Sequence, residues 1–188
     1  MVGILALQGD VREHQENLQR HGMQSTCIRR PSDFDGIDAL ILPGGESTTI
    51  QRLIISSGLL EPVKAYIQKG LPLWGTCAGV VLLAKGGLLE CVEILVDRNA
   101  YGSQLYSRVA KGKSQVVDGE ISMAFIRAPR IRSDTGNVEV LCRLDGYIVA
   151  IRQRNILLTT FHPELTPENP FTSYFIDMVR ISKHAREV

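Results

Sequence analysis

The chain has 188 residues, of which 44% are hydrophobic, enough for one well-packed domain and too few for two. Lysine and arginine total 21 against 20 aspartates and glutamates, and this near balance argues against a nucleic-acid-binding or membrane-surface protein. No charged leader precedes an apolar stretch, and no apolar run approaches the ~20 residues of a membrane span, so we expect a cytoplasmic protein.

The first half of the chain alternates short apolar runs with amphipathic ones. Strands are predicted at residues 2–7, 25–28, 39–42 and 73–74, and helices at residues 11–21, 48–56, 61–69 and 78–85. Such alternation is typical of a mainly parallel sheet covered by helices on both faces. We therefore predict an α/β fold, formed as a single domain over residues 1–188, with functional residues in loops at strand ends.

A glycine pair, Gly44 and Gly45, follows the strand predicted at residues 39–42. Glycines at the carboxyl end of a strand expose backbone N–H groups, and fixed N–H donors are what an oxyanion hole needs during acyl transfer. A simple turn, in which Ser47 or Thr48 caps the next helix, explains the same residues. The loop is therefore a candidate oxyanion hole only in combination with a nucleophile.

The segment Gly75-Thr76-Cys77-Ala78-Gly79 has the form of a nucleophile elbow, in which a strand turns sharply into a helix. The glycines let the backbones of the strand and the helix pass closely, and the central side chain is held exposed above the sheet. A helix beginning at Ala78 would aim its unpaired N–H groups at the sulfur, which favours the thiolate. The alternative is a structural cysteine in a tight turn, since free cysteine is often buried. Cys77 is thus a candidate nucleophile.

The second half of the chain is richer in predicted strands. They fall at residues 92–96, 121–126, 138–141, 147–151 and 156–160, and a helix is predicted at residues 171–183. Arg127, Arg130 and Arg132 are interpreted as a solvated strand-loop rather than a nucleic-acid site. The four cysteines form no C-x-x-C pair, so neither a metal site nor a disulfide framework is predicted.

Two histidines head an H-x-E triplet, a spacing that could supply a base for Cys77 and a carboxylate to orient that base. His14 and Glu16 lie in the helix predicted at residues 11–21. Residues two apart on a helix point about 200° away from each other, so these two side chains cannot act together.

The second triplet, His162-Pro163-Glu164, follows the strand predicted at residues 156–160. Pro163 favours an extended conformation, in which the side chains of His162 and Glu164 share a face. Glu164 could then orient His162 toward the thiol of Cys77. A solvated surface pair of histidine and glutamate is the alternative.

Together these motifs resemble those of the class I glutamine amidotransferases, and more narrowly those of the glutaminase subunits of pyridoxal 5'-phosphate synthase. The resemblance extends from residue 2 to residue 180 and is carried by residues 7–10, 43–49, 75–79, 125–129 and 161–166. It implies a flavodoxin-like α/β fold with a mainly parallel central sheet.

The resemblance further implies that L-glutamine is hydrolysed to glutamate and ammonia through a glutamyl thioester, without a cofactor. Cys77 would attack the carboxamide, His162 would act as base and then as acid, and Glu164 would orient His162. Backbone N–H groups of Gly45 and Ala78 would form the oxyanion hole. The residues expected to hold glutamine are Gly44, Gly45, Glu46, Arg98, Ile126 and Arg127.

A synthase subunit that accepts the ammonia, within a large hetero-oligomer, is the partner that the resemblance implies. Gln8 would lie at the site entrance on the partner side, and docking of the partner would complete the oxyanion hole. The chain departs from the family at Ser103, where many members have arginine, and in a shorter loop over residues 86–90.

Two other functions fit the same residues. A free-standing cysteine hydrolase, such as a γ-glutamyl hydrolase, would use the triad without a partner and reach its full rate alone. An inactive interaction subunit would keep the fold without the chemistry, and Cys77→Ala would then change no activity.

Overall fold

The structure is a computed structural model that describes residues 1–98, 107–134, 137–166 and 168–187. Its strands are β1 (Val2–Leu5), β2 (Ser25–Ile28), β3 (Ala39–Leu42), β4 (Leu73–Thr76), β5 (Ile94–Asp97), β6 (Ser107–Lys113), β7 (Glu120–Ile126), β8 (Arg130–Asp134), β9 (Glu139–Leu144), β10 (Tyr147–Gln153) and β11 (Ile156–Thr159). Its helices are α1 (Val11–Arg20), η1 (Pro31–Phe34), α2 (Ser47–Ser56), α3 (Leu60–Gln68), α4 (Ala78–Leu83), η2 (Pro163–Leu165) and α5 (Pro170–Glu187).

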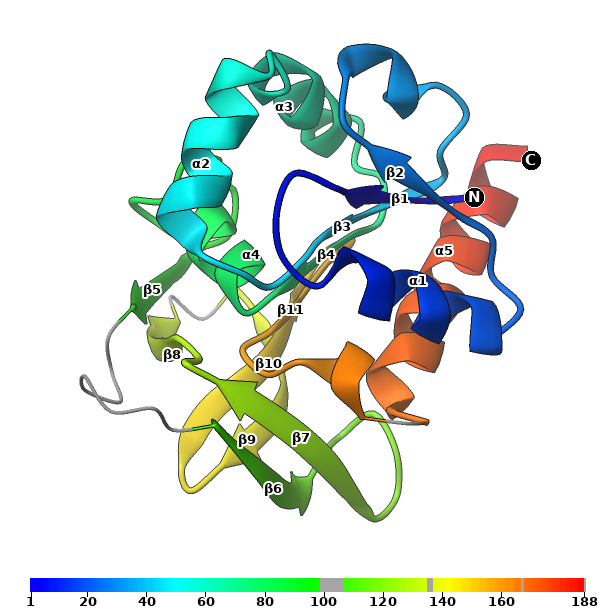
Figure 1. Ribbon diagram of the computed structural model, residues 1–188. Helices are drawn as coiled ribbons and strands as arrows, with labels where there is room; N and C mark the ends of the chain where they lie inside the picture. Colours follow the sequence, from blue (N-terminus) through cyan, green and yellow to red (C-terminus); the bar gives the residue numbers. More distant parts are fainter. Residues whose placement is uncertain (99–106, 135–136, 167, 188) are drawn as a thin grey trace.

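One nine-stranded sheet organises these elements, in the order β2-β1-β3-β4-β11-β10-β8-β5 with β9 paired to β10 (Figure 1). The strands from β2 to β11 are parallel to their neighbours, whereas the pairs made by β10, β8, β9 and β5 beyond them are antiparallel. The remaining strands, β6 and β7, form a two-stranded antiparallel sheet. The prediction of an α/β fold around a parallel sheet is confirmed.

The parallel half of the sheet has the strand order of flavodoxin-like folds, 2-1-3-4-5, if β11 is counted as the fifth strand. In such a sheet the chain moves outward in opposite directions from the first strand, and ligands bind beyond the carboxyl ends of the strands at that point. The loops after β1 and β3 meet there. Gln8 belongs to the first loop and the Gly44-Gly45 pair to the second.

Helices cover both faces of the sheet and bury two separate cores. The helices α2, α3 and α4 lie on one face, where Ile54, Val63 and Leu83 join one cluster of buried side chains. On the other face lie α1 and α5, whose Leu18 and Phe175 pack with Trp74 of the sheet (Figure 1). A sheet buried on both sides explains why its central strands are apolar throughout rather than alternating.

The register of β4 and β11 fixes the site. These parallel neighbours place Thr76 opposite Thr159, and the Cys77 N–H donates to the Thr159 carbonyl at 2.9 Å. Cys77 and His162 therefore follow two strand ends that are level with each other. The His162 N–H donates to the Ala124 carbonyl of β7 at 2.8 Å, which fixes the chain just beyond β11.

Most predicted elements agree with the structure, and the strands at residues 25–28 and 39–42 are confirmed without change. The strands β6 and β8 were not predicted, because their sequences, Ser-Arg-Val-Ala-Lys-Gly-Lys and Arg-Ile-Arg-Ser-Asp, are mostly polar. The predicted helix at residues 78–85 ends earlier, at Leu83, where Ala84 turns to extended backbone. In the described part of the chain no helix has the length and apolar character needed to cross a membrane.

Candidate active site

Cys77 occupies a strained turn between β4 and α4. Its φ of 45° and ψ of −98° are unusual for a residue other than glycine, and such backbone persists only where the surrounding structure enforces it. The side chain is only 5% exposed, so it is more covered than the sequence predicted. The Cys77 thiol approaches the Ile126 carbonyl oxygen at 3.8 Å, which shows what covers it.

The two glycines of the elbow are required by close approach. A Cβ at Gly79 would lie 2.4 Å from the Leu42 carbonyl oxygen, and one at Gly75 would lie 2.9 Å from the Leu158 and Leu83 side chains. The first contact is with backbone, which cannot rotate away. The elbow therefore packs directly against the end of β3, where the glycine-pair loop begins.

His162 and Glu164 form a buried hydrogen-bonded pair. The Nδ1 atom of His162 lies 2.7 Å from Glu164 Oε1, and both residues are 3% exposed. The Nε2 atom of His162 is buried and has no hydrogen-bond partner among the described residues, so it is the ring nitrogen left for a reacting proton. The alternative of a solvated surface pair is excluded.

The backbone between these two residues differs from the prediction. Pro163–Leu165 forms the 3-10 helix η2 rather than extended chain, so Glu164 reaches the imidazole by a tight turn. Proline fixes its own φ near the helical value and is well suited to the first position of such a turn. The predicted contact between His162 and Glu164 is present, but the prediction that a shared strand face would produce it was wrong.

The pKa of His162 is set by opposing effects. Burial lowers it, but the Asp10 carboxylate, the nearby Cys77 thiol and the Glu164 carboxylate outweigh burial and raise the pKa well above its usual value. These contacts all favour the protonated ring. His162 is thus suited to accept a proton from the thiol of Cys77 and to hold it.

The loops after β1 and β3 are packed closely against each other. The Glu46 N–H donates to Gln8 Oε1 at 2.9 Å, and a Cβ at Gly45 would collide with that amide. A Cβ at Gly44 would lie 2.4 Å from His162 Cε1. The structure therefore places Gly44 against the imidazole, and Gly45, Glu46 and Gln8 beside one another in the same pair of loops.

The carboxylate of Glu46 has a structural partner. It caps α2 by accepting hydrogen bonds from Thr48 N at 3.1 Å and from Thr49 N at 2.6 Å, together with the Thr49 hydroxyl. These bonds, led by the hydroxyl of Thr49, lower the pKa of Glu46 to about 2. The predicted caps, Ser47 and Thr48, are instead the first residues of the helix.

The turn that follows β7 forms another wall of the site. The Ile126 carbonyl approaches the Cys77 thiol, as described above, and the Ile126 side chain is 39% exposed. Arg127 is exposed and has a φ of 47°, so this turn is also strained. The Ile126 backbone thus lies beside the thiol, and Arg127 is the next residue in the same turn.

Arg98 lies near the site but makes no contact with its reacting groups in the described part of the chain. Arg98 is exposed and follows β5, whose Asp97 pairs with Arg130 of β8, so Arg98 comes beside the loop that carries Arg127. No contact joins Arg98 to the thiol or imidazole in the described structure.

Ala78 begins α4, and its N–H is among the first four of the helix, which lack intrahelical partners. The Ser103 prediction falls outside the described residues.

Two residues that were not predicted to belong to the site also contact it: Asp10, and His14, which was set aside with the first H-x-E triplet. Asp10 Oδ2 lies 3.1 Å from His162 Nδ1. The Nε2 atom of His14 lies 3.5 Å from Glu164 Oε2 and 3.3 Å from the Thr76 hydroxyl, and its burial lowers the pKa of His14. The signal for His14 was its spacing from Leu18, which marks the inward face of α1.

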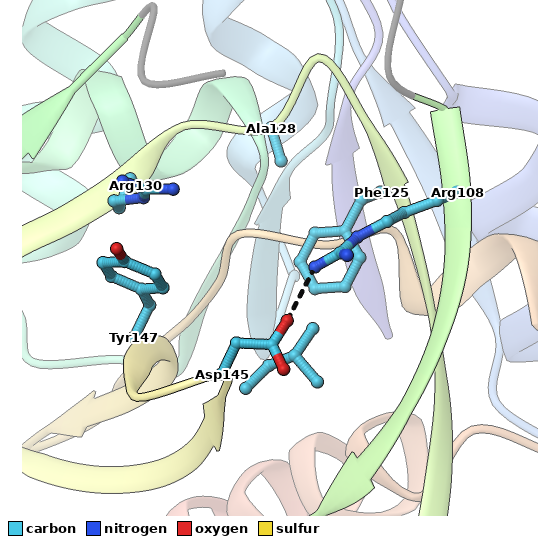
Figure 2. Close-up of a pocket in the computed structure, with 7 residues that line it drawn as sticks. Arg108, Phe125, Ala128, Arg130, Asp145 and Tyr147 are labelled. Carbon is cyan, nitrogen blue, oxygen red and sulfur yellow. Dashed lines mark hydrogen bonds and ion pairs between the residues drawn. The ribbon is translucent and has the colours of Figure 1, made fainter.

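A separate pocket of about 290 Å³ lies beside the site, between β7 and β10 (Figure 2). Figure 2 shows Arg108 directed toward Asp145, 3.1 Å away, and the Arg130 guanidinium stacks 3.8 Å above the Tyr147 ring. Both arginines are already engaged within the protein. The pocket contains none of the predicted catalytic residues.

A thiol at a strained strand-to-helix turn, next to a buried imidazole–carboxylate pair, is the arrangement of a cysteine hydrolase of α/β fold. Comparisons with known proteins narrow this class. The family model of the SNO glutamine amidotransferase family matches residues 4–181. The chain belongs to that family.

Curated proteins are similar to this chain along nearly their whole length. The pyridoxal 5'-phosphate synthase subunit PdxT of Clostridium beijerinckii is 44% identical over 182 residues, 93% of this chain and 96% of the relative. The subunit of the same name from Roseiflexus castenholzii is 45% identical over 187 residues, 94% of this chain and 99% of the relative. A crystal structure of a glutamine amidotransferase matches with a TM-score of 0.88 at 40% identity, covering 95% of this chain and 98% of that one.

Proposed function

We propose that this chain is the glutaminase subunit of a pyridoxal 5'-phosphate synthase, which hydrolyses L-glutamine and delivers the ammonia to a synthase subunit. The relatives that carry the name of that subunit match over nearly the full chain. The observation that carries the chemistry is the strained Cys77 turn beside the buried pair of His162 and Glu164, joined at 2.7 Å.

In the proposed mechanism, His162 Nε2 takes the thiol proton of Cys77, and Cys77 Sγ then attacks the side-chain carboxamide carbon of glutamine. The C–N bond then breaks, and the imidazolium gives its proton to the departing ammonia. Water attacks the resulting glutamyl thioester, His162 again takes a proton, and glutamate leaves with the thiol restored. Glu164 holds Nδ1 throughout, so that Nε2 faces the reacting atoms.

Charge develops on the carbonyl oxygen in both attacks, and fixed N–H donors would stabilise it. We assign these donors to the backbone of Gly45 and Ala78. Support for this assignment comes from the contact of the elbow with the end of β3, where a Cβ at Gly79 would meet the Leu42 carbonyl. The two donor loops therefore start from a common point.

The remaining residues would hold the amino-acid end of glutamine. An arginine fork suits its carboxylate, and Arg98 and Arg127 come from neighbouring turns. Since the Glu46 carboxylate already caps α2, we assign its contribution, like that of Gly44, to backbone groups. The carbonyl of Ile126 lies beside the thiol and would contact the bound side chain.

The finer features of the assembly are also proposals. We place the chain in a large hetero-oligomer in the cytoplasm, folded as a single domain over residues 1–188, with Gln8 at the entrance facing the synthase subunit. Ammonia must pass to the partner without loss, so a closed interface over this entrance is needed. A sheet that continues from β2 to β5 supports a single domain.

The test is ammonia release from glutamine by the purified chain, first alone and then with a pyridoxal 5'-phosphate synthase subunit, with Cys77→Ala as control. We expect slow release alone, strong activation by the partner and none from Cys77→Ala. Equal rates with and without the partner would assign a free-standing hydrolase instead. Absence of release under both conditions would refute the proposed function.

A further inference from the structure

Asp10 stands at the N-cap of α1 but does not cap it. Aspartate is a preferred N-cap residue because its carboxylate accepts hydrogen bonds from the first turn of a helix. Here the side chain makes no such bond. Its Oδ2 instead lies 3.1 Å from His162 Nδ1, so the carboxylate contacts the site instead of capping α1.

The position of Asp10 is fixed by the loop around it. Its N–H donates to the Gly44 carbonyl at 3.3 Å, and a Cβ at Gly44 would lie 2.7 Å from Asp10 Oδ2. The carboxylate thus sits between the glycine-pair loop and the imidazole. It is 30% exposed, whereas Glu164, on the same ring nitrogen, has a fully buried side chain.

His162 Nδ1 consequently faces two carboxylates, at 2.7 Å and 3.1 Å. A single N–H is shared between two acceptors, and two anions so close to a neutral ring would repel each other without compensation. A positive ring attracts both. Consistent with this, the hydrogen bond to His162 is the main reason why the pKa of Asp10 is lowered.

We propose that Asp10 is a positioning residue that shares the Nδ1 proton of His162 with Glu164 and so stabilises the imidazolium that forms when Cys77 loses its proton. This role rests on the proposed function and adds a second carboxylate to its triad. It acts before glutamine binds, on the thiolate–imidazolium pair of the free enzyme.

Among the described residues, Asp10 and Glu164 are the carboxylates that face the ring, and the other titratable groups add no further one. The titratable groups that face His162 are Asp10 from the loop before α1, His14 from α1, Cys77 from the elbow and Glu164 from η2. Burial lowers the pKa of His14, so His14 is neutral near pH 7 and does not oppose a positive His162.

A metal ion is the rival explanation for the same cluster. One ligand atom from each of Asp10, His162 and Glu164 lies within 4.8 Å of the others, which is compatible with a shared cation. A cation on Nδ1 would replace the bonds to both carboxylates and would favour a neutral ring. The proposal therefore predicts that a chelator leaves the activity unchanged, whereas a bound cation predicts that a chelator abolishes it.

The experiment compares wild type with Asp10→Asn and Asp10→Ser, the second because serine can cap α1 and protect the fold. The rate of Cys77 alkylation by iodoacetamide is followed from pH 4 to 9 at the level of the Cys77 peptide. Glutamine turnover with the synthase subunit gives kcat and KM. The matched control is Glu16→Gln, which removes an exposed carboxylate of α1 that pairs with Arg12.

We expect the protonated ring of His162 to lose about one pKa unit of stability in both Asp10 variants, as for loss of one nearby opposite charge. Less of the thiolate–imidazolium pair then forms, and the alkylation rate of Cys77 near pH 7 should fall severalfold. We also expect kcat to fall about tenfold, matching that one unit, with KM for glutamine unchanged. Glu16→Gln should behave as wild type. An alkylation profile like that of wild type in both Asp10 variants would overturn the proposal, as would wild-type activity that EDTA abolishes and Zn²⁺ restores. Failure of wild type to release ammonia would instead refute the proposed function.

Discussion

At the scale of single residues, the site depends on backbone that is held away from its preferred conformation. Cys77 and Arg127 both have positive φ, and each costs of the order of 1–3 kcal/mol relative to relaxed backbone. The neighbouring glycines and strand ends enforce these turns. Strained backbone often occurs at functional sites, and here it occurs in two turns around one buried thiol.

The first prediction concerns His162. Replacing it by asparagine removes the base and should lower kcat for glutamine by about 10²–10⁴-fold or more, because proton transfer to and from the reacting atoms is lost. The measurement is ammonia release with the synthase subunit present. The control is His184→Asn, at an exposed position of α5, which should retain wild-type turnover. Normal turnover by His162→Asn would contradict the mechanism.

At the scale of elements, two contacts hold the strand ends and helix starts of the site in register. Gly79 lets α4 approach β3, and Glu46 caps the start of α2 directly after the glycine pair. Both positions lie within a few residues of the proposed oxyanion donors. Changes in them should therefore alter stability and the geometry of the donors together.

Gly79→Ala should destabilise the fold by about 1–3 kcal/mol, the usual cost of overpacking, because its Cβ would lie 2.4 Å from the Leu42 carbonyl. Urea unfolding monitored by circular dichroism measures this. Gly112→Ala in β6 is the matched change, since the nearest atoms to its Cβ are the flexible ends of Met123 and Leu144. An equal effect of both substitutions would show that contact with backbone is not the cause.

Glu46→Gln should reduce stability in a pH-dependent way. The folded protein lowers the pKa of Glu46 from 4.5 to about 2, so the ionised cap stabilises the fold above pH 4.5 and loses this effect as the pH falls toward 2. Because the side chain is exposed, we expect only about 0.3–1 kcal/mol at pH 7. Unfolding free energies from pH 7 to 3 should converge for wild type and Glu46→Gln. For comparison, Glu120→Gln, at an exposed position of β7, should show no such convergence.

At the scale of the whole molecule, α5 covers one face of the sheet and buries its largest side chains. Phe175 is fully buried and its ring lies 5.1 Å from that of Trp74, in the strand that leads to Cys77. The same face carries His14 of α1, whose ring meets Trp74 edge-on at 6.0 Å. The aromatic cluster thus supports the strand beneath the nucleophile.

Phe175→Ala should destabilise the protein by about 3–5 kcal/mol, since it removes a buried ring and leaves a cavity beside Trp74. Ile181→Ala, on the same helix but 69% exposed, should change stability by less than about 0.5 kcal/mol. The free energy of unfolding of both variants can be measured by chemical denaturation. Similar losses would mean that α5 does not close this core.

Much of the fold could be predicted because its signals are local. The strand at residues 39–42 is a run of four apolar residues, and the elbow is a contiguous pentapeptide whose glycines define the turn. The strand β6 gave no such signal, because most of its residues are polar and its pairing with β7 is a tertiary contact. The 3-10 turn at Pro163–Leu165 was also missed, because proline favours extended backbone in the residue before it but itself fits the first position of a helical turn.

The sequence by itself determined the α/β class and the residue types of the candidate triad, because hydrophobic period, glycine spacing and the H-x-E triplet are properties of neighbouring residues. Only the tertiary structure decided what surrounds His162. Asp10 and His14 come from a segment more than 140 residues away in the chain. The sheet order β1-β3-β4-β11 brings them to the imidazole, and no local pattern records which strands become neighbours.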